Sequence, residues 1–400
     1  MFQYVRSFVR ACRMTVLGRG GWEPAGAVAG VLGLTVAAVA QPATGTDFQW
    51  ATIGAPGNAA YTGPSAGGIA TGRGSVAAEF RISTLEVSTA QWLEFANFAG
   101  ALNEPFRIGD GPVGGYEPDP TYAGPGRRYR LSSVSSAAQL PVYGISWLNA
   151  ARYCNWLHND KGMASPSLSA LAGGAYDTST FGPSTTPPGG RTDALTRSPG
   201  ARYFIPSLDE WMKAVYFQPA IIPGPIGAGS WRTQPNGSDT PLVAGLIGTP
   251  GAQTNAGLAS APASSLVLGG YSTTRSPWGL LDASGGASEW LEDVDDPQDR
   301  LYRLYAGSSA FDPFLNPLLL DTIGGVGASL AAGETSYIGL RLASAIPDPS
   351  GGFLVGCLCG ATIATRRRRR CPAPHSPPGP LPAISAPAPR SASLRPPWPA

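Results

Sequence analysis

The stretch Ser276-Pro277-Trp278-Gly279-Leu280 and the nearby Gly285-Gly286-Ala287-Ser288-Glu289-Trp290 close an ordered series of short motifs that each contain tryptophan. Three earlier members of the series are Glu86-Val87-Ser88-Thr89-Ala90-Gln91-Trp92, Pro141-Val142-Tyr143-Gly144-Ile145-Ser146-Trp147 and Ile205-Pro206-Ser207-Leu208-Asp209-Glu210-Trp211. Single pieces such as Ser-Trp or Glu-Trp are weak signals. The order of all of them along one chain is the informative property.

The three earlier motifs predict three helices, each beginning after a serine that can cap it. Ser88 with Gln91, and Ser207 with Glu210, match the capping box, in which the cap and the third helical residue bond each other's backbone N–H groups. Apolar residues then recur at helical spacing. We expect these stripes to be buried: Trp92, Phe95, Ala96 and Ala99; Trp147, Ala150, Cys154 and Leu157; Leu208, Trp211 and Val215. The first clear strand pattern is Val76–Ile82.

Residues 1–40 have the layout of a secretory signal peptide. Arginines at 6, 10, 13 and 19 precede an apolar run at 25–40 that ends on Ala38-Val39-Ala40. An uncleaved membrane anchor is the alternative, although this run of 16 residues is shorter than the ~20 that a spanning helix needs. We therefore expect an exported protein, with translation starting at Met1 or Met14.

Residues 346–370 form a second targeting segment. Pro347-Asp348-Pro349 is followed by an apolar stretch at 351–365 and by five arginines at 366–370. A cationic cluster after an apolar stretch resists translocation and stays cytoplasmic. The layout resembles the bacterial PEP-CTERM sorting signal, with Asp348 in place of the usual glutamate, which implies removal by a membrane protease. We expect a transient or retained C-terminal anchor, a location in the cell envelope or outside the cell, and a disordered Pro-rich tail at 371–400.

The core between these ends is acidic and poor in cysteine. Residues 41–365 carry 17 basic and 25 acidic side chains, a net charge near −8, and an acidic surface disfavours nucleic-acid binding. Cys154 is the one cysteine within this range ahead of the C-terminal apolar stretch, so no disulfide is expected inside the domain. We interpret Cys154 as a small buried residue of the second helix.

Together with the closing Tyr337-Ile338-Gly339-Leu340-Arg341-Leu342-Ala343, the motif series resembles the formylglycine-generating enzyme family, also called sulfatase-modifying factor domains. The resemblance covers about residues 76–345 and implies an α+β fold, related to C-type lectin domains, with few helices, short strands and much irregular loop. Residues 41–75 are expected to form an extended lead-in with one or two short strands. The segment Trp231–Thr240 resembles a version of the domain found in exported bacterial proteins with PEP-CTERM tails.

The resemblance also implies a copper-dependent oxidation by a cysteine pair, and this pair is missing here. Catalytic members bind copper with a cysteine pair that follows an Arg-Gly-Gly-Ser-Trp stretch. The corresponding stretch here is Leu304–Phe311, where Gly307 and Ser308 match, but no cysteine lies between Cys154 and Cys357. A Cu(I) ion selects soft sulfur ligands. We therefore expect neither copper nor formylglycine-generating oxidoreductase activity, which remains the alternative function.

Calcium is the cofactor that the sequence leaves open. Asn255 resembles a ligand asparagine of the family, and Asp282 and Glu289 could offer further hard oxygens. The competing interpretation of Glu289 is a core ion pair with Arg341. The acidic run 292–299 lacks the pattern of an EF-hand loop and is expected to be solvated.

His158 is the only histidine of the core, which excludes two-histidine metal motifs and leaves a single candidate for a Ser–His pair. Its place at the end of the second helix favours a structural role, because a cation suits the C-terminal end of a helix dipole.

These features favour a non-catalytic exported module whose partner is a polysaccharide or an envelope protein. Surface aromatics would stack on sugar rings, and the candidates are Trp231, Tyr271 and Trp278. The tryptophans of the motif series are instead expected in the core. An enzyme that uses other chemistry on this fold, and a purely architectural surface protein, are the two competing hypotheses.

Overall fold

The computed structural model describes residues 47–346 apart from short gaps at 66–67, 109–114, 165, 187, 222–223, 259–265, 312–320 and 334–336. The expected signal peptide, sorting signal and Pro-rich tail lie outside the described residues. Within the described part of the chain, no helix is long and apolar enough to cross a membrane. The apolar stretch at 351–365, the expected anchor, is outside this range.

The described part has few helices and many short strands, as the sequence predicted. The helices are α1 (Thr89–Ala101), α2 (Trp147–His158), α3 (Ser169–Ala172) and α4 (Leu208–Tyr216), with 3-10 turns at Ala137–Gln139, Asp160–Gly162 and Thr178–Thr180. Two four-stranded sheets have the orders β1-β2-β14-β7 and β12-β11-β10-β13, and three two-stranded ribbons pair β3 with β4, β5 with β6 and β8 with β9. The strands are β1 (Trp50–Ile53), β2 (Phe80–Ser83), β3 (Tyr116–Pro118), β4 (Tyr129–Leu131), β5 (Pro183–Thr185), β6 (Pro188–Arg191), β7 (Tyr203–Phe204), β8 (Phe217–Pro219), β9 (Gly229–Trp231), β10 (Ser288–Val294), β11 (Tyr302–Ala306), β12 (Val326–Leu330), β13 (Ile338–Gly339) and β14 (Ala343–Ala345).

The three long helices begin where their caps predicted. Ser88 accepts from the Gln91 backbone N–H while the Gln91 side chain accepts from Ser88, and Ser207 forms the same reciprocal pair with Glu210. Ser146 caps α2 by accepting from the backbone of Asn149. All the predicted apolar stripe residues of these helices are buried. The helix predictions are therefore confirmed.

Loss of the α4 cap should be measurable. Replacing Ser207 by alanine removes the acceptor for the Glu210 backbone N–H and is expected to lower the free energy of unfolding by about 1 kcal/mol. Urea denaturation of the full chain measures the change. Ser230, exposed on β9, provides the matched control, since its replacement by alanine should cost no more than about 0.5 kcal/mol. Equal effects of the two substitutions would contradict the capping role.

The first sheet joins distant parts of the chain and corrects one sequence expectation. Strand β1, within the expected lead-in at 41–75, is one of the short strands predicted there, and it pairs antiparallel with β2. Strand β2 starts at Phe80 rather than Val76 because Val76 is engaged elsewhere: its N–H donates to Asn58 Oδ1 and its carbonyl accepts from Gly57. Strands β14 and β7 complete the sheet, bringing residues 203–204 beside 343–344.

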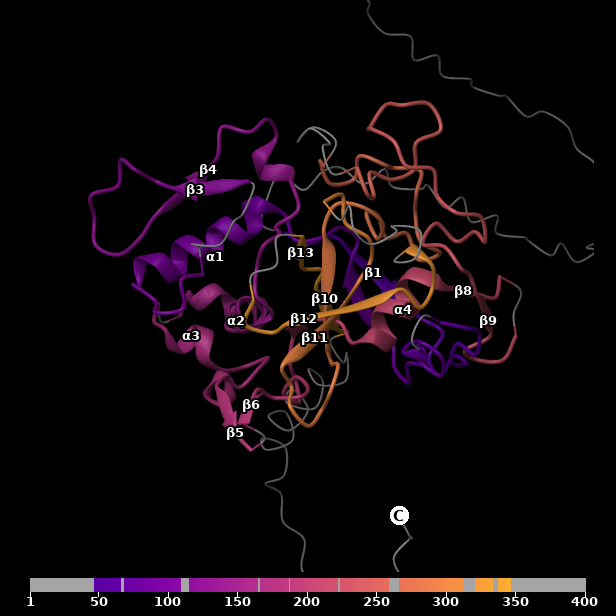
Figure 1. The fold of residues 1–400 in the computed structure, drawn as a ribbon, viewed down its shortest axis with the longest axis horizontal. Helices are drawn as coiled ribbons and strands as arrows, with labels where there is room; N and C mark the ends of the chain where they lie inside the picture. The colour runs from indigo at the N-terminus through magenta and orange to yellow at the C-terminus, as the bar shows by residue number, and fades with distance from the viewer. Residues whose placement is uncertain are drawn as a thin grey trace, which may run out of the picture. The chain divides into compact units, whose positions relative to one another are not determined.

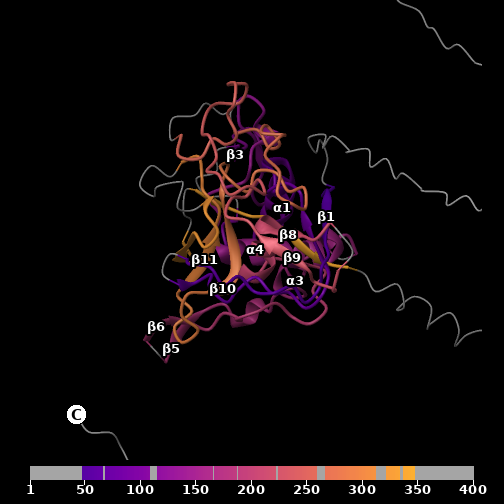
Figure 2. The ribbon, with the colours of Figure 1, turned by 90° about the vertical axis from the view of Figure 1, so that its right-hand side faces the viewer.

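The second sheet holds the core together through its central strand β10. In Figure 1, α1, α2 and α3 lie on one side of β10 and α4 on the other, and Figure 2 shows α4 close to β10 from the side. The Trp147 indole donates to the Leu291 carbonyl at 2.9 Å, and the Trp290 indole donates to the Ile145 carbonyl at 2.9 Å. The Trp211 indole reaches Glu289 from the side of α4. The hydrogen bonds of Trp147, Trp290 and Trp211 therefore link the helices on both sides to strand β10.

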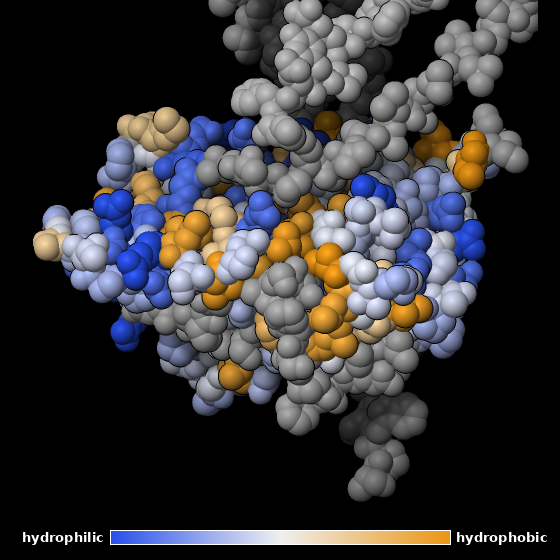
Figure 3. Space-filling model, turned by 90° about the horizontal axis from the view of Figure 1, so that it is seen from above, coloured by the Kyte–Doolittle hydropathy of each residue, from blue (hydrophilic) through white to orange (hydrophobic). Residues whose placement is uncertain are grey.

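Between these elements the backbone is largely irregular. The segment 166–200 contains α3, β5 and β6, whereas 232–287 contains no strand or helix among its described residues. The face seen in Figure 3 intersperses hydrophilic and apolar residues. The α+β architecture with much loop agrees with the sequence prediction.

Candidate functional site

The centre of the domain contains a buried ion pair. Arg341 and Glu289 are both fully buried, and the Arg341 guanidinium donates to the Glu289 carboxylate at 2.7 and 2.9 Å. Arg341 also donates to the carbonyls of Ser83 and Leu281, and Trp211 Nε1 donates to Glu289 Oε2 at 2.6 Å. Both carboxylate oxygens are therefore held by N–H donors, and the interpretation of Glu289 as the core partner of Arg341 is confirmed.

Two further carboxyl groups surround this pair. Burial, followed by the charge of Glu289, holds the pKa of Glu86 well above its usual range, against the lowering effect of Arg341. Burial raises the pKa of the Asp282 carboxyl to about 6. Asp282 accepts from the Gly269 backbone N–H at 2.6 Å, and Glu86 accepts from Ala287 at 3.1 Å. Three carboxyls face one guanidinium, which disfavours the ionised form of Glu86.

The turn at Gly285-Gly286 explains the missing asparagine of the family motif. Both glycines have positive φ, 84° and 63°, a region that favours glycine. A Cβ atom on Gly286 would lie 2.9 Å from Glu86 Oε2, and one on Gly285 would lie 2.2 Å from Asn255 Oδ1. Asn255 Oδ1 accepts from the Gly286 backbone N–H at 2.8 Å. Asn255 therefore holds the turn, and Glu86 occupies the space beside it.

The three candidate calcium ligands have separate hydrogen-bond partners. Asn255 binds the 285–286 turn, Asp282 binds the backbone of Gly269, and Glu289 binds Arg341. No group of three or more His, Cys, Asp or Glu side chains able to hold a metal occurs within the described ranges. A calcium ion at Glu289 would have to displace a buried guanidinium. Asn255 is the candidate whose side chain an ion could share with neighbouring carbonyl oxygens.

A second buried polar network includes Ser308, within the stretch 304–311 that the sequence resemblance matched to the copper-binding region of catalytic members. The Ser308 hydroxyl donates to Asp321 Oδ1, and Ser284 Oγ lies 2.7 Å from Asp321 Oδ2 and 2.8 Å from Thr254 Oγ1. The backbone N–H of Gly285 donates to Ser308 Oγ at 3.1 Å. All four side chains are buried, and burial raises the pKa of Asp321 to about 6.

This network offers only hard oxygen donors, which do not fit a Cu(I) ion. Its hydroxyls are committed to Asp321 and closed to solvent, so they are poor nucleophiles as well. Asp321 was not found by sequence reasoning, because it lies in an apolar stretch without a motif, and its proximity to Ser284 and Ser308 is created by the fold.

His158 and Cys154 have structural surroundings. Burial, and then the charge of Arg202, lowers the pKa of His158, and its Nδ1 accepts from the Arg202 backbone N–H at 3.2 Å. These contacts agree with the structural role predicted for His158, and the Arg202 guanidinium also donates to the His158 carbonyl at 3.2 Å, which places a cation at the end of α2. Cys154 is buried, and burial raises the pKa of its thiol well above the usual range. Its predicted core role is confirmed.

The three aromatic candidates for ligand contact are used in packing. Trp231 donates to the Ala59 carbonyl and packs against Tyr61 and Phe217. Tyr271 is buried and donates to the Gly245 carbonyl at 2.6 Å, and Trp278 packs against the core around α4. A small hollow instead lies beside Glu86. Its cavity volume of about 20 Å³ is room for about one water molecule.

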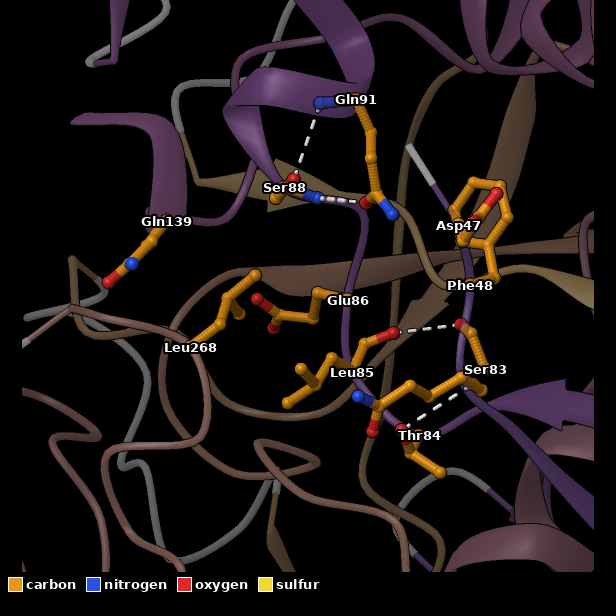
Figure 4. Close-up of a pocket in the computed structure, with 11 residues that line it drawn as sticks. Asp47, Phe48, Ser83, Thr84, Leu85, Glu86, Ser88, Gln91, Gln139 and Leu268 are labelled. Carbon is orange, nitrogen blue, oxygen red and sulfur yellow. Dashed lines mark hydrogen bonds between the residues drawn. The ribbon is translucent and has the colours of Figure 1, made fainter. Parts of the chain in front are cut away.

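Figure 4 shows this hollow with Glu86 near its centre, Gln139 and Leu268 on one side, and Asp47 and Phe48 on the other. Gln91 reaches it from the first turn of α1, where its side chain completes the cap. The lining is polar apart from Phe48, Leu85 and Leu268. Sequence reasoning missed the hollow because its residues come from four separate segments.

A family model described as "Sulfatase-modifying factor enzyme 1-like domain" matches residues 51–346. Among solved structures, the chain is similar to one titled "Crystal Structure of CarF", at 20% identity and a TM-score of 0.43, covering 75% of this chain and 99% of that one.

Two other similar structures are Treponema denticola variable protein 1, at 14% identity and a TM-score of 0.42, and PvdO from Pseudomonas aeruginosa, at 13% and 0.32. Each match covers 75% of this chain, and 95% and 92% of those chains, respectively. No curated protein matches the chain.

Proposed function

Because the chain belongs to the sulfatase-modifying factor enzyme 1-like family, we propose that it is a non-catalytic member, exported to the cell envelope or beyond, that binds polysaccharide. The family and its α+β fold are those that the motif series predicted. The binding role is inferred from the absence of the cysteine pair and from the intact scaffold of capped helices and motif tryptophans.

The observation that carries the proposal is the closed network of Ser308, Ser284 and Asp321. It includes Ser308, within the stretch 304–311 that the sequence resemblance matched to the thiol-bearing region of catalytic members, with each hydroxyl committed to a buried carboxylate. The chain has no cysteine from 155 to 356. The scaffold is nevertheless intact, since its capped helices and motif tryptophans are all in place. An intact scaffold without the oxidising sulfurs supports a recognition role.

The two ends of the chain support export. The leader-like layout at 1–40 and the arginine-terminated segment at 346–370 fit a protein that is secreted and then processed by a membrane sorting protease. Cell fractionation, with mass spectrometry of the mature C-terminus, tests this part. We expect a mature chain that ends before the arginine cluster. A full-length chain in the cytoplasmic fraction would contradict it.

The function is tested by measuring binding of the purified full chain to the extracellular polysaccharide of its host. Saturable binding is expected. In parallel, the chain is incubated with copper and a cysteine-containing sulfatase peptide, and mass spectrometry is expected to show no conversion of the cysteine to formylglycine. Turnover of the peptide would overturn the non-catalytic assignment. The absence of binding together with self-assembly would support the architectural hypothesis instead.

Removal of calcium provides a separate test. Glu289 is neutralised by Arg341, so we expect binding to be unchanged by a chelator. If binding is lost in chelator and restored by calcium, the ion is required, and Asn255→Ala becomes the variant that locates it.

A further inference from the structure

The outer face of the sheet β1-β2-β14-β7 carries Trp50 and Tyr203 on its two edge strands, and Ser83, Arg81 and Ser344 on the strands between them. In the observed register, Trp50 of β1 pairs with Ser83 of β2, and Ser344 of β14 pairs with Tyr203 of β7. Side chains alternate between faces along a strand, and the other face carries buried residues such as Ile82 and Phe204. Ser83 and Ser344 are buried, and Arg81, on the same face, donates to Ser344 Oγ at 3.5 Å and places its guanidinium 5.7 Å from the centroid of the Trp50 ring.

The two edge aromatics lean toward each other across the middle strands. Their ring centroids lie 6.0 Å apart with an interplanar angle of 31°, although two strands separate them in the sheet. Phe48 extends the aromatic row, with its centroid 5.7 Å from that of Trp50. All three residues are half-buried, and the Trp50 indole N–H donates to none of the described residues. Three rings from two segments, 48–50 and 203, therefore lie together at the surface.

These rings line an open groove of about 430 Å³ whose other wall is the end of α2 and the turn after it, within the size range of small-molecule sites. Leu157, Asp160, Lys161 and Met163 form that wall, and Asp47 lies at the rim. Asp47 and Phe48 also line the polar hollow of Figure 4. The aromatic groove therefore adjoins the hollow beside Glu86 through Asp47 and Phe48, which line both.

The charged side chains on the α2 wall of the groove are paired. Lys161 pairs with Glu94 at 2.8 Å, and Asp160 pairs with Arg202 at 2.7 Å. On the opposite wall the guanidiniums of Arg81 and Arg202 lie 5.7 Å from the centroids of the Trp50 and Tyr203 rings, and Asp47 contributes one carboxylate. The lining is therefore a set of flat apolar rings bordered by charged and hydrogen-bonding groups.

We propose that this groove is the glycan-binding site, with the C–H face of an uncharged pyranose stacked on Trp50 or Tyr203 and its hydroxyls bonded by the rim. The assignment rests on the proposed function, since it locates the polysaccharide that the function requires. An aromatic ring presents a flat apolar face to the C–H groups of a sugar, and the carboxylate of Asp47 accepts from sugar hydroxyls. Trp231, Tyr271 and Trp278 then make no contact with the glycan.

The test measures binding of full-chain variants to the host's extracellular polysaccharide, separated into neutral and acidic fractions. Trp50→Leu and Tyr203→Leu keep an apolar side chain against the core but lose the ring. Each is expected to weaken binding of the neutral fraction about tenfold. Asp47→Asn, a change at an exposed residue, is expected to weaken it less. The matched control is Tyr302→Leu, because Tyr302 is 39% exposed on the other four-stranded sheet.

A measurement on the unmodified chain covers the case in which a variant fails to fold. Oxidation of indoles by N-bromosuccinimide, mapped by peptide mass spectrometry, is expected to be slowed by the glycan at Trp50 and unchanged at Trp231 and Trp278. Lack of protection at Trp50, or binding of the acidic fraction alone, would overturn the site. If the wild-type chain binds no glycan, the proposed function itself fails. If it binds and the ring variants bind equally well, only the site assignment fails.

Discussion

Replacing Arg341 by methionine is expected to lower the free energy of unfolding by about 3–5 kcal/mol. Methionine matches the length of the arginine stem but leaves Glu289 buried without its cation. The Ser83 and Leu281 carbonyls lose their donors at the same time. Glu86 and Asp282 also lose the only guanidinium that lowers their pKa values. The loss of unfolding free energy is therefore that of leaving a buried charge cluster uncompensated, which is larger than the loss from one broken hydrogen bond.

Urea denaturation of the two chains measures this loss, with Arg130→Met as the matched control. Arg130 pairs with Glu117 at 2.7 Å on the exposed β3–β4 ribbon, where an ion pair contributes about 0–1 kcal/mol. Adding Glu289→Gln to Arg341→Met should recover part of the stability, because the glutamine is uncharged and can still accept from Trp211. A loss for Arg341→Met as small as that of the control would show that the buried pair is dispensable.

The domain is expected to become less stable as pH rises from about 5 to 8. Burial raises the pKa of Asp282 and Asp321 to about 6 and that of Glu292 to about 7, and it raises that of Glu86 as well. Between the unfolded pKa values near 4 and these folded values, the folded state binds more protons than the unfolded state. Stability therefore falls as pH rises through this window.

The total change should be on the order of several kcal/mol, since each unit of pKa shift corresponds to about 1.4 kcal/mol. Thermal or urea unfolding at a series of pH values gives the profile, which should level off above the pKa of Glu292. The variant Glu292→Gln should flatten the upper part of the window, whereas Glu117→Gln on the exposed ribbon should leave it unchanged. Stability that rises between pH 5 and 8 would contradict this assignment of the buried carboxyls.

The sequence alone identified the features that depend on neighbouring residues. Ser88, Ser146 and Ser207 mark helix starts because a cap and its partner lie three residues apart, and the apolar stripes follow from the helical period. The family was predictable for a related reason: the motif tryptophans that join α2 and α4 to β10 are spaced in a fixed order. The alternative pairing of Glu289 with Arg341 was also foreseen, since a charge in an apolar strand needs a partner.

Only the tertiary structure decided which residues meet across the chain. Asp321 joins Ser284 and Ser308, Glu86 joins the Glu289–Arg341 pair, and Trp50 approaches Tyr203 although 153 residues separate them in sequence. None of these residues has a local pattern that shows its partner, and Tyr271, one of the three aromatics expected at the surface, is buried for the same reason. Exposure and pairing depend on strand order and register. Hydrophobic burial sets these over the whole domain, so no short stretch of sequence contains them.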